Sequence, residues 1–217
     1  MKYRYKMRSL LASLVVVAGL STATILHSNF ALTPATITSK DEVSATLDTL
    51  EVKGRAPKTN YSRDQFGEGR GQINGCDTRN VILMRDLTNV QNEGCRVISG
   101  TLNDPYTGRE VVFTRGSTTG SVVQIDHIVA LSDAWQKGAQ LLSKEDRVKL
   151  ANDPLELLAV DGKANQQKSD GDAATWLPSN KSFRCEYASR QIAVKKKYSL
   201  WVTEAEKAAL RSALTSC

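Results

Sequence analysis

Histidine is scarce in this chain of 217 residues, and several kinds of site are excluded by what is missing. Two histidines occur, and the four cysteines have no C-x-x-C spacing, so a zinc site of imidazole and thiolate has too few ligands. Neither a glycine-rich phosphate loop nor an internal repeat is present. The 41% of hydrophobic and 24% of charged residues are typical of a globular domain of ordinary size.

Acidic residues are absent from the first 40 positions. Four basic residues there precede an apolar run over residues 10–20, which has the length of a signal-peptide core. We predict a signal peptide over residues 1–31 and a secreted, extracellular protein. The alternative is an uncleaved N-terminal anchor with an extracytoplasmic domain, because residues 10–26 reach the lower limit for spanning a membrane. No other membrane partner is expected.

The net charge of +6 overstates the basicity of the exported part. Without the leader, 25 basic and 23 acidic residues leave a net charge of +2, so bulk charge does not identify a nucleic-acid-binding protein. A basic stretch over residues 181–197 is compatible with a DNA-binding face or with a solvated helix face, and the sequence leaves both open.

All four cysteines lie in the exported part, at Cys76, Cys95, Cys185 and Cys217. An oxidising compartment favours two disulfides over free thiols. Four cysteines allow three pairings, and proximity favours Cys76–Cys95 and Cys185–Cys217. Each bridge would contribute about 3 kcal/mol of stability.

The chain divides into the leader, a Ser-, Thr- and Pro-containing segment over residues 32–60 that we expect to be a flexible linker, and one structured domain over residues 61–217. Within the domain, apolar periodicity and capping residues predict an α+β fold. The expected helices cover residues 77–85, 133–142, 143–151, 183–198 and 204–213, with a further helix starting at Asn165. The expected strands cover residues 96–102, 109–114, 122–128 and 155–160, the first two as a hairpin.

Two clusters carry the predicted chemistry. Asp126 and His127 end one strand, and 38 positions after His127 comes Asn165, followed one helical turn later by Lys168. An ordinary imidazole pKa of about 6.5 suits His127 as the general base that takes a proton from water. Asp126 and Asn165 offer hard oxygen ligands, which favour Mg²⁺, with Mn²⁺ as the alternative. Lys168 and Arg79 are the predicted phosphate contacts.

The domain resembles the secreted HNH endonuclease family that is related to the C-terminal nuclease domain of GmrSD restriction enzymes. The resemblance rests on many blocks in one order. They are Cys-Asp-Thr-Arg-Asn at 76–80, Asp-Pro-Tyr-Thr-Gly at 104–108, Asp-His-Ile-Val-Ala-Leu at 126–131, Ala-Asn-Asp-Pro-Leu at 151–155, Leu-Leu-Ala-Val at 157–160, Asn-x-x-Lys at 165–168, Trp-Leu-Pro at 176–178 and Arg-Cys-x-Tyr at 184–187. The resemblance implies a ββα-metal core, a hairpin and helix around one divalent ion, and hydrolysis of DNA phosphodiester bonds.

One position departs from the family pattern. The middle residue of the HNH motif is usually an asparagine nine positions before Asn165, and this chain has Glu156 there. A glutamate can accept hydrogen bonds from the loop that carries His127, but in its ionised form it cannot donate them. Glu156 is therefore a candidate catalytic residue, either as an added carboxylate near the metal or as a change that slows the enzyme.

These observations predict a monomeric secreted endonuclease that acts on DNA, with RNA as the alternative substrate. The rival hypothesis is a nucleic-acid-binding module that keeps the same fold and has little or no catalytic activity. A weaker rival is a cell-surface interaction domain in which Asp126 and His127 are structural.

Overall fold

The computed structural model describes residues 39–69, 71–116 and 121–217. The predicted leader and cleavage site lie outside these residues. No helix within the described ranges is long and apolar enough to cross a membrane. The helices are α1 (Lys40–Thr49), α2 (Thr78–Asp86), α3 (Leu131–Gln136), α4 (Lys144–Asn152), α5 (Gly162–Lys168), α6 (Arg184–Lys197) and α7 (Glu204–Leu214), with 3-10 turns η1 (Arg63–Phe66), η2 (Ala139–Leu141) and η3 (Lys181–Phe183).

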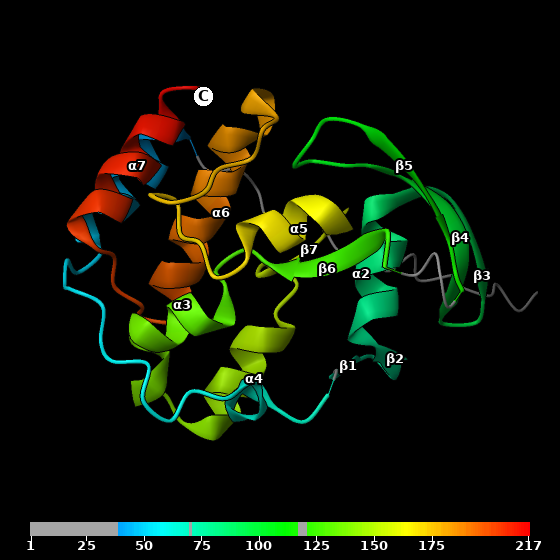
Figure 1. The fold of residues 1–217 in the computed structure, drawn as a ribbon, viewed down its shortest axis with the longest axis horizontal. Coiled ribbons are helices and arrows are strands. Elements are labelled where there is room, and N and C mark those ends of the chain that lie inside the picture. The colour runs from blue at the N-terminus through cyan, green and yellow to red at the C-terminus, as the bar shows by residue number, and fades with distance from the viewer. Residues whose placement is uncertain (1–38, 70, 117–120) are drawn as a thin grey trace, which may run out of the picture. The chain divides into compact units, whose positions relative to one another are not determined.

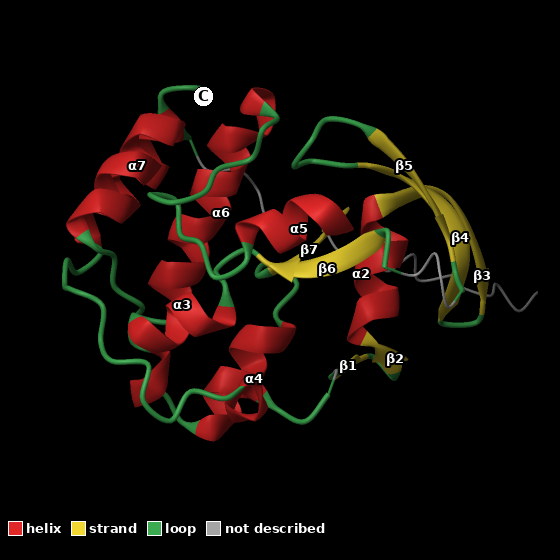
Figure 2. Cartoon of the chain, in the orientation of Figure 1, coloured by secondary structure: helices red, strands yellow, loops and turns green. Residues whose placement is uncertain are grey.

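The strands form three small antiparallel sheets, so the predicted α+β class is confirmed (Figure 2). They are β1 (Gln72–Ile73) with β2 (Cys76–Asp77), then β3 (Leu87–Glu93), β4 (Arg96–Asn103) and β5 (Glu110–Thr114) in that order, and finally β6 (Val123–His127) with β7 (Leu157–Asp161). The predicted hairpin of β4 and β5 is confirmed, with Asn103 opposite Glu110.

The β6–β7 pair is the part of the fold that presents the candidate site. Its register sets His127 opposite Leu157 and Val123 opposite Asp161. Helix α5 follows β7 directly and lies beside both strands (Figure 1). It begins at Gly162 and not at Asn165 as predicted, because the Asp161 side chain accepts a hydrogen bond from the Ala164 amide and caps the helix three residues earlier.

Two further elements differ from the prediction. Strand β3 was not predicted because six of its seven residues are only partly buried or exposed, so it has no apolar alternation, and its pairing with β4 contains a bulge near Asn89. The helix expected over residues 133–142 is a short α3 followed by η2. The break comes at Gly138, whose φ of 121° is not helical. Glycine also fits there because an added Cβ would lie only 3.2 Å from the Trp201 ring.

The segment predicted as a flexible linker contains α1, which packs in the domain core. Val43, Leu47 and Leu50 are buried against residues of α6 and α7 such as Ile192 and Leu210. Their spacing of four and three is the helical period, but the surrounding Ser, Thr and Asp residues obscured it.

Residues 51–66, which we call the N-terminal strap, connect α1 to the rest of the domain. Val52 forms a parallel β-bridge with Val202. The indole N–H groups of Trp201 and Trp135 donate hydrogen bonds to the backbone carbonyls of Gly54 and Thr59. The folded domain therefore begins near Lys40 and not at residue 61.

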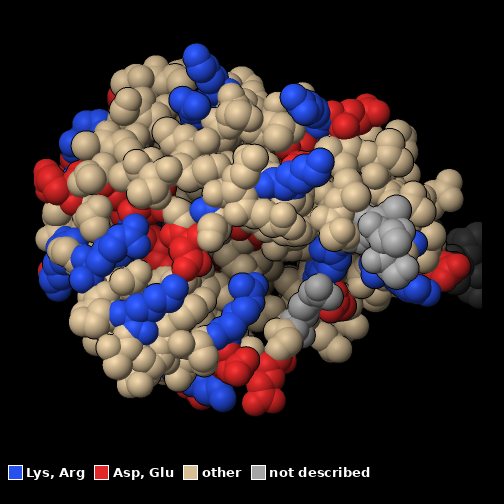
Figure 3. Space-filling view, viewed as in Figure 1, with Lys and Arg blue, Asp and Glu red and all other residues tan. Residues whose placement is uncertain are grey.

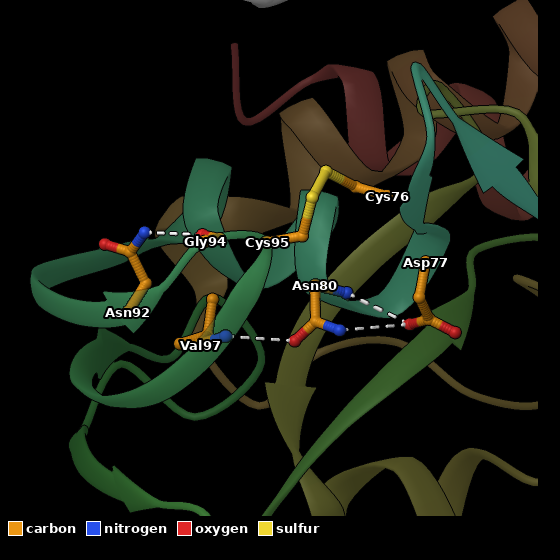
Figure 4. Close-up of a disulfide and its surroundings, with 7 residues drawn as sticks. All are labelled: Cys76, Asp77, Asn80, Asn92, Gly94, Cys95 and Val97. Carbon is orange, nitrogen blue, oxygen red and sulfur yellow. Dashed lines mark hydrogen bonds between the residues drawn. A yellow bond between two sulfur atoms is a disulfide. The ribbon is translucent and has the colours of Figure 1, made fainter.

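Both predicted disulfides are present, Cys76–Cys95 and Cys185–Cys217. Figure 4 shows that the first joins Cys76 of β2, just before α2, to Cys95 in the turn between β3 and β4. Beside it, Asn80 accepts a hydrogen bond from the Val97 amide (Figure 4). The first bridge and this bond fix the N-terminal end of α2 against the three-stranded sheet.

A buried ion cluster joins the strap to three helices. Lys137, fully buried, lies within 2.8 Å of carboxylate oxygens of Asp133, Asp172 and Glu206. Arg55 of the strap pairs with Asp133 and Asp172, and Lys195 of α6 pairs with Glu206. Three positive and three negative groups balance, and leaving one of them buried without a partner would cost about 3–5 kcal/mol.

We predict that Leu47→Ala lowers the free energy of unfolding by about 2–5 kcal/mol, because it leaves a cavity in the core. Leu141→Ala is the matched control, since Leu141 is 79% exposed, and its effect should stay within about 0.5 kcal/mol. Urea denaturation of both variants measures the difference. Equal, small effects would mean that α1 does not belong to the domain.

Candidate functional site

Asp126 and His127 end β6 and point to different surroundings. The Asp126 side chain is 7% exposed and faces α5. Its carboxylate accepts a hydrogen bond from the Tyr106 hydroxyl at 2.5 Å and lies 3.0 Å from the ammonium of Lys168. Because side chains alternate along a strand, the neighbouring His127 faces α4 instead.

Lys168 is buried and does not line the cleft that contains His127. Its ammonium pairs with Asp126 and donates to the His127 carbonyl at 2.7 Å. Lys168 was predicted to contact a phosphate, and the structure places it in the interior instead. The Asn-x-x-Lys spacing turns both side chains toward β6, and the Lys168 side chain is the one that is buried there. Its role in the structure is to bind α5 to the end of β6.

Glu156 is also fully buried, so it offers no carboxylate to the cleft. One carboxyl oxygen accepts from the Val129 amide at 3.2 Å, and its backbone carbonyl accepts from Ile128. Burial raises the pKa of Glu156 well above its ordinary value, which favours the neutral form. Glu156 is therefore not placed to act as a catalytic carboxylate. It holds the loop after His127, as the asparagine is expected to do in the family.

Gln191 of α6 supports the same loop. Its side-chain amide donates to the Ile128 carbonyl at 2.9 Å and to the Tyr187 hydroxyl. Tyr187 packs edge-on against Tyr106, the partner of Asp126. Sequence reasoning missed Gln191 and Tyr106. For Tyr106 a signal was present, since it stands in the Asp-Pro-Tyr-Thr-Gly block.

The imidazole of His127 is held in one tautomer. Its Nε2 lies 3.0 Å from the Ala151 carbonyl, which can only accept, so Nε2 carries the hydrogen and Nδ1 keeps a lone pair. Burial lowers the pKa of His127 from 6.5 to about 4, although the nearby Asp126 carboxylate and the Ala151 carbonyl oppose that shift; Arg63 adds a smaller lowering. At neutral pH the side chain is an uncharged base.

Asn165 is half-buried on α5. Its side-chain amide nitrogen donates to the Gln124 carbonyl oxygen at 2.9 Å. The side-chain carbonyl oxygen of Asn165 accepts no hydrogen bond from the described residues, so this oxygen is available to a ligand.

His127 and Asn165 open into one cleft of about 750 Å³. Arg79 lines it too, while its guanidinium donates to the Val123 carbonyl at 2.9 Å and lies over the Phe113 ring. The cleft does not include Asp126, Glu156 or Lys168 among its described lining residues. The other charged lining residues are Arg63, Asp64 and Asp77.

A divalent cation fits the chemistry of the available oxygens. Asn165 offers its side-chain carbonyl oxygen in the cleft. Asp126 lies outside the described lining of the cleft but keeps lone pairs, because a carboxylate has about four such sites and two accept hydrogen bonds here. The described residues contain no cluster of three or more His, Cys, Asp or Glu residues suited to a metal. Two protein oxygens completed by water are typical of weakly held Mg²⁺ or Mn²⁺.

Comparisons with known proteins agree with the family resemblance predicted from the sequence motifs. Residues 77–213 match the family described as GmrSD restriction endonucleases, C-terminal domain. The chain is 38% identical over 205 residues to a protein of Arthroderma benhamiae named "Uncharacterized secreted protein", covering 93% of this chain and 98% of that one. No solved structure matches the chain.

We predict that His127 in the metal-free protein titrates with a midpoint near pH 4. NMR of the imidazole measures it directly in protein without residues 1–31 or a histidine tag, where His127 is the only histidine. Because the unfolded chain takes up a proton near pH 6.5 and the folded chain does so only near pH 4, stability should fall as the pH drops between these values. A midpoint near 6.5 would contradict the buried, hydrogen-bonded geometry.

Proposed function

The chain belongs to the family of the C-terminal domain of GmrSD restriction endonucleases, and from this we propose that it is a secreted, metal-dependent endonuclease that hydrolyses DNA phosphodiester bonds. The observation that carries the proposal is the neutral His127, which lines the same cleft as Asn165 and Arg79 and whose Nδ1 is left as the proton acceptor by the Nε2–Ala151 contact. A low-pKa imidazole with one nitrogen fixed by a carbonyl is suited to accept a proton from water.

The proposed reaction divides the work among these residues. His127 takes a proton from the attacking water at Nδ1, and the Ala151 carbonyl keeps the ring oriented. When bound, a divalent cation supplies positive charge against the scissile phosphate and the leaving oxygen. Asp126 and Asn165 would hold it, and Arg79 would orient the substrate phosphate. Glu156 and Lys168 would not contact the substrate; they hold the backbone around His127 through hydrogen bonds.

Secretion has independent support. The relative from Arthroderma benhamiae is named a secreted protein, and all four cysteines form disulfides, which persist in oxidising compartments. That the protein is a monomer stays a prediction, as does DNA in preference to RNA.

A second candidate is a nucleic-acid-binding module with little catalytic activity. The observation that favours it is the pairing of Asp126 with Tyr106 and Lys168, since a carboxylate with two buried partners binds a cation less readily. Glu156 no longer favours this candidate, because in the structure it supports the loop after His127 as the family asparagine is expected to do.

The test is cleavage of supercoiled plasmid DNA with Mg²⁺, with Mn²⁺ or with EDTA. We expect cleavage with either cation, silence in EDTA and recovery when the cation is restored. His127→Ala should lower the rate about 10²- to 10⁴-fold while leaving the melting temperature nearly unchanged.

Lys163→Ala is the matched control, because Lys163 lies exposed on α5. It should cleave at the wild-type rate. Cleavage by His127→Ala at that rate would refute the general-base assignment. Wild-type protein that binds DNA without cutting it would favour the second candidate.

A further inference from the structure

We propose that Arg63, which the N-terminal strap carries into the cleft, binds a backbone phosphate of the DNA substrate. The inference rests on the nuclease function proposed above and adds a residue to its substrate-binding surface. It concerns a segment that precedes the residues matched to the family.

Arg63 has the position and the freedom that a phosphate contact needs. It lines the same cleft as His127 and Asn165, and it is exposed. Its guanidinium forms no hydrogen bond or ion pair with a residue that the structure describes. A guanidinium whose N–H groups have no other acceptor can donate two hydrogen bonds to the oxygens of one phosphate.

The strap fixes where this side chain starts. Phe66, at the end of η1, is 2% exposed and packs against Trp135 and Tyr61. Arg147 of α4 donates to both the backbone and side-chain carbonyl oxygens of Gln65, at 2.9 and 3.1 Å. The backbone of Arg63 is therefore held on both sides, and binding has to order only the side chain.

Three of the cations that the sequence offered for this task form contacts elsewhere in the domain. Lys168 is buried against Asp126, and Lys195 of the basic stretch is buried against Glu206. Arg190 donates to the carbonyls of Leu155 and Leu157. These contacts make the basic stretch structural at two of its positions. In Figure 3, basic side chains border a hollow near the centre of the face shown.

The charge of the cleft makes Arg63 important for an anionic substrate. Among the described lining residues, Arg63 and Arg79 are positive and Asp64 and Asp77 are negative. The charges of these described residues therefore balance. Without Arg63 the described lining would carry a net negative charge, which repels phosphate.

Binding of a labelled DNA duplex, followed by fluorescence anisotropy in EDTA between 50 and 200 mM salt, tests the proposal without cleavage. Each phosphate neutralised contributes about −0.9 to the slope of log K against log salt for duplex DNA. Arg63→Ala should weaken binding about equally for different sequences and reduce the slope by about 0.9. Arg63→Lys should restore most of the slope.

Arg109→Ala is the matched control, an exposed arginine in the turn before β5 that does not line the cleft. It should bind as the wild type does. An unchanged slope and affinity for Arg63→Ala would overturn the inference, and a wild-type protein that binds no duplex would overturn it together with the nuclease function. A reduced slope in a protein that cuts no plasmid would support the inference while refuting the proposed activity.

Discussion

The buried ammonium of Lys168 is the interaction on which the arrangement of the site depends. It joins the end of α5 to the carboxylate of Asp126 and to the backbone carbonyl of His127. A buried ammonium without partners costs several kcal/mol, so α5 and the end of β6 have to keep their relative position. Asn165, one helical turn before Lys168, is thereby held beside Gln124 in the lining of the cleft.

A second set of side chains extends this constraint to the residues after His127. Gln191 holds the Ile128 carbonyl, and Glu156 holds the Val129 amide. Arg85 and Arg190 both donate to the Leu157 carbonyl, opposite His127 in the sheet. The imidazole is therefore surrounded by fixed backbone on its covered side and opens to the cleft on the other. Burial of the ring is the main cause of its lowered pKa, and the contact of Nε2 with the Ala151 carbonyl leaves Nδ1 as the nitrogen that can accept a proton.

The features that sequence reasoning predicted are those with local causes. Asp77, Ser143 and Thr203 each cap the helix predicted to start there, because the capping bond lies within four residues of chain. The disulfide pairing followed from proximity in sequence. Of the predicted site residues, His127 at the end of β6 and Asn165 on α5 line one cleft, and Asp126 lies outside its described lining; their catalytic roles stay a prediction.

The features that it missed depend on partners far away in the chain. Whether Lys168 faces a phosphate or a carboxylate is decided by the packing of α5 on β6, 41 positions earlier, and no local pattern records that. Arg63 reaches the cleft only because Arg147 and Trp135 anchor the strap. Glu156 reads as a catalytic carboxylate in the sequence, and its burial makes it a support of the backbone.

A double-mutant cycle between Asp126 and Lys168 tests the central claim most directly. The free energy of unfolding would be measured by denaturant titration in EDTA for the wild type, Asp126→Asn, Lys168→Met and the double variant. If the buried pair holds the site together, each single change leaves a buried polar or charged group unpaired, and the coupling energy should be about 1.5–3 kcal/mol. Single effects that add to within about 0.5 kcal/mol would contradict the account.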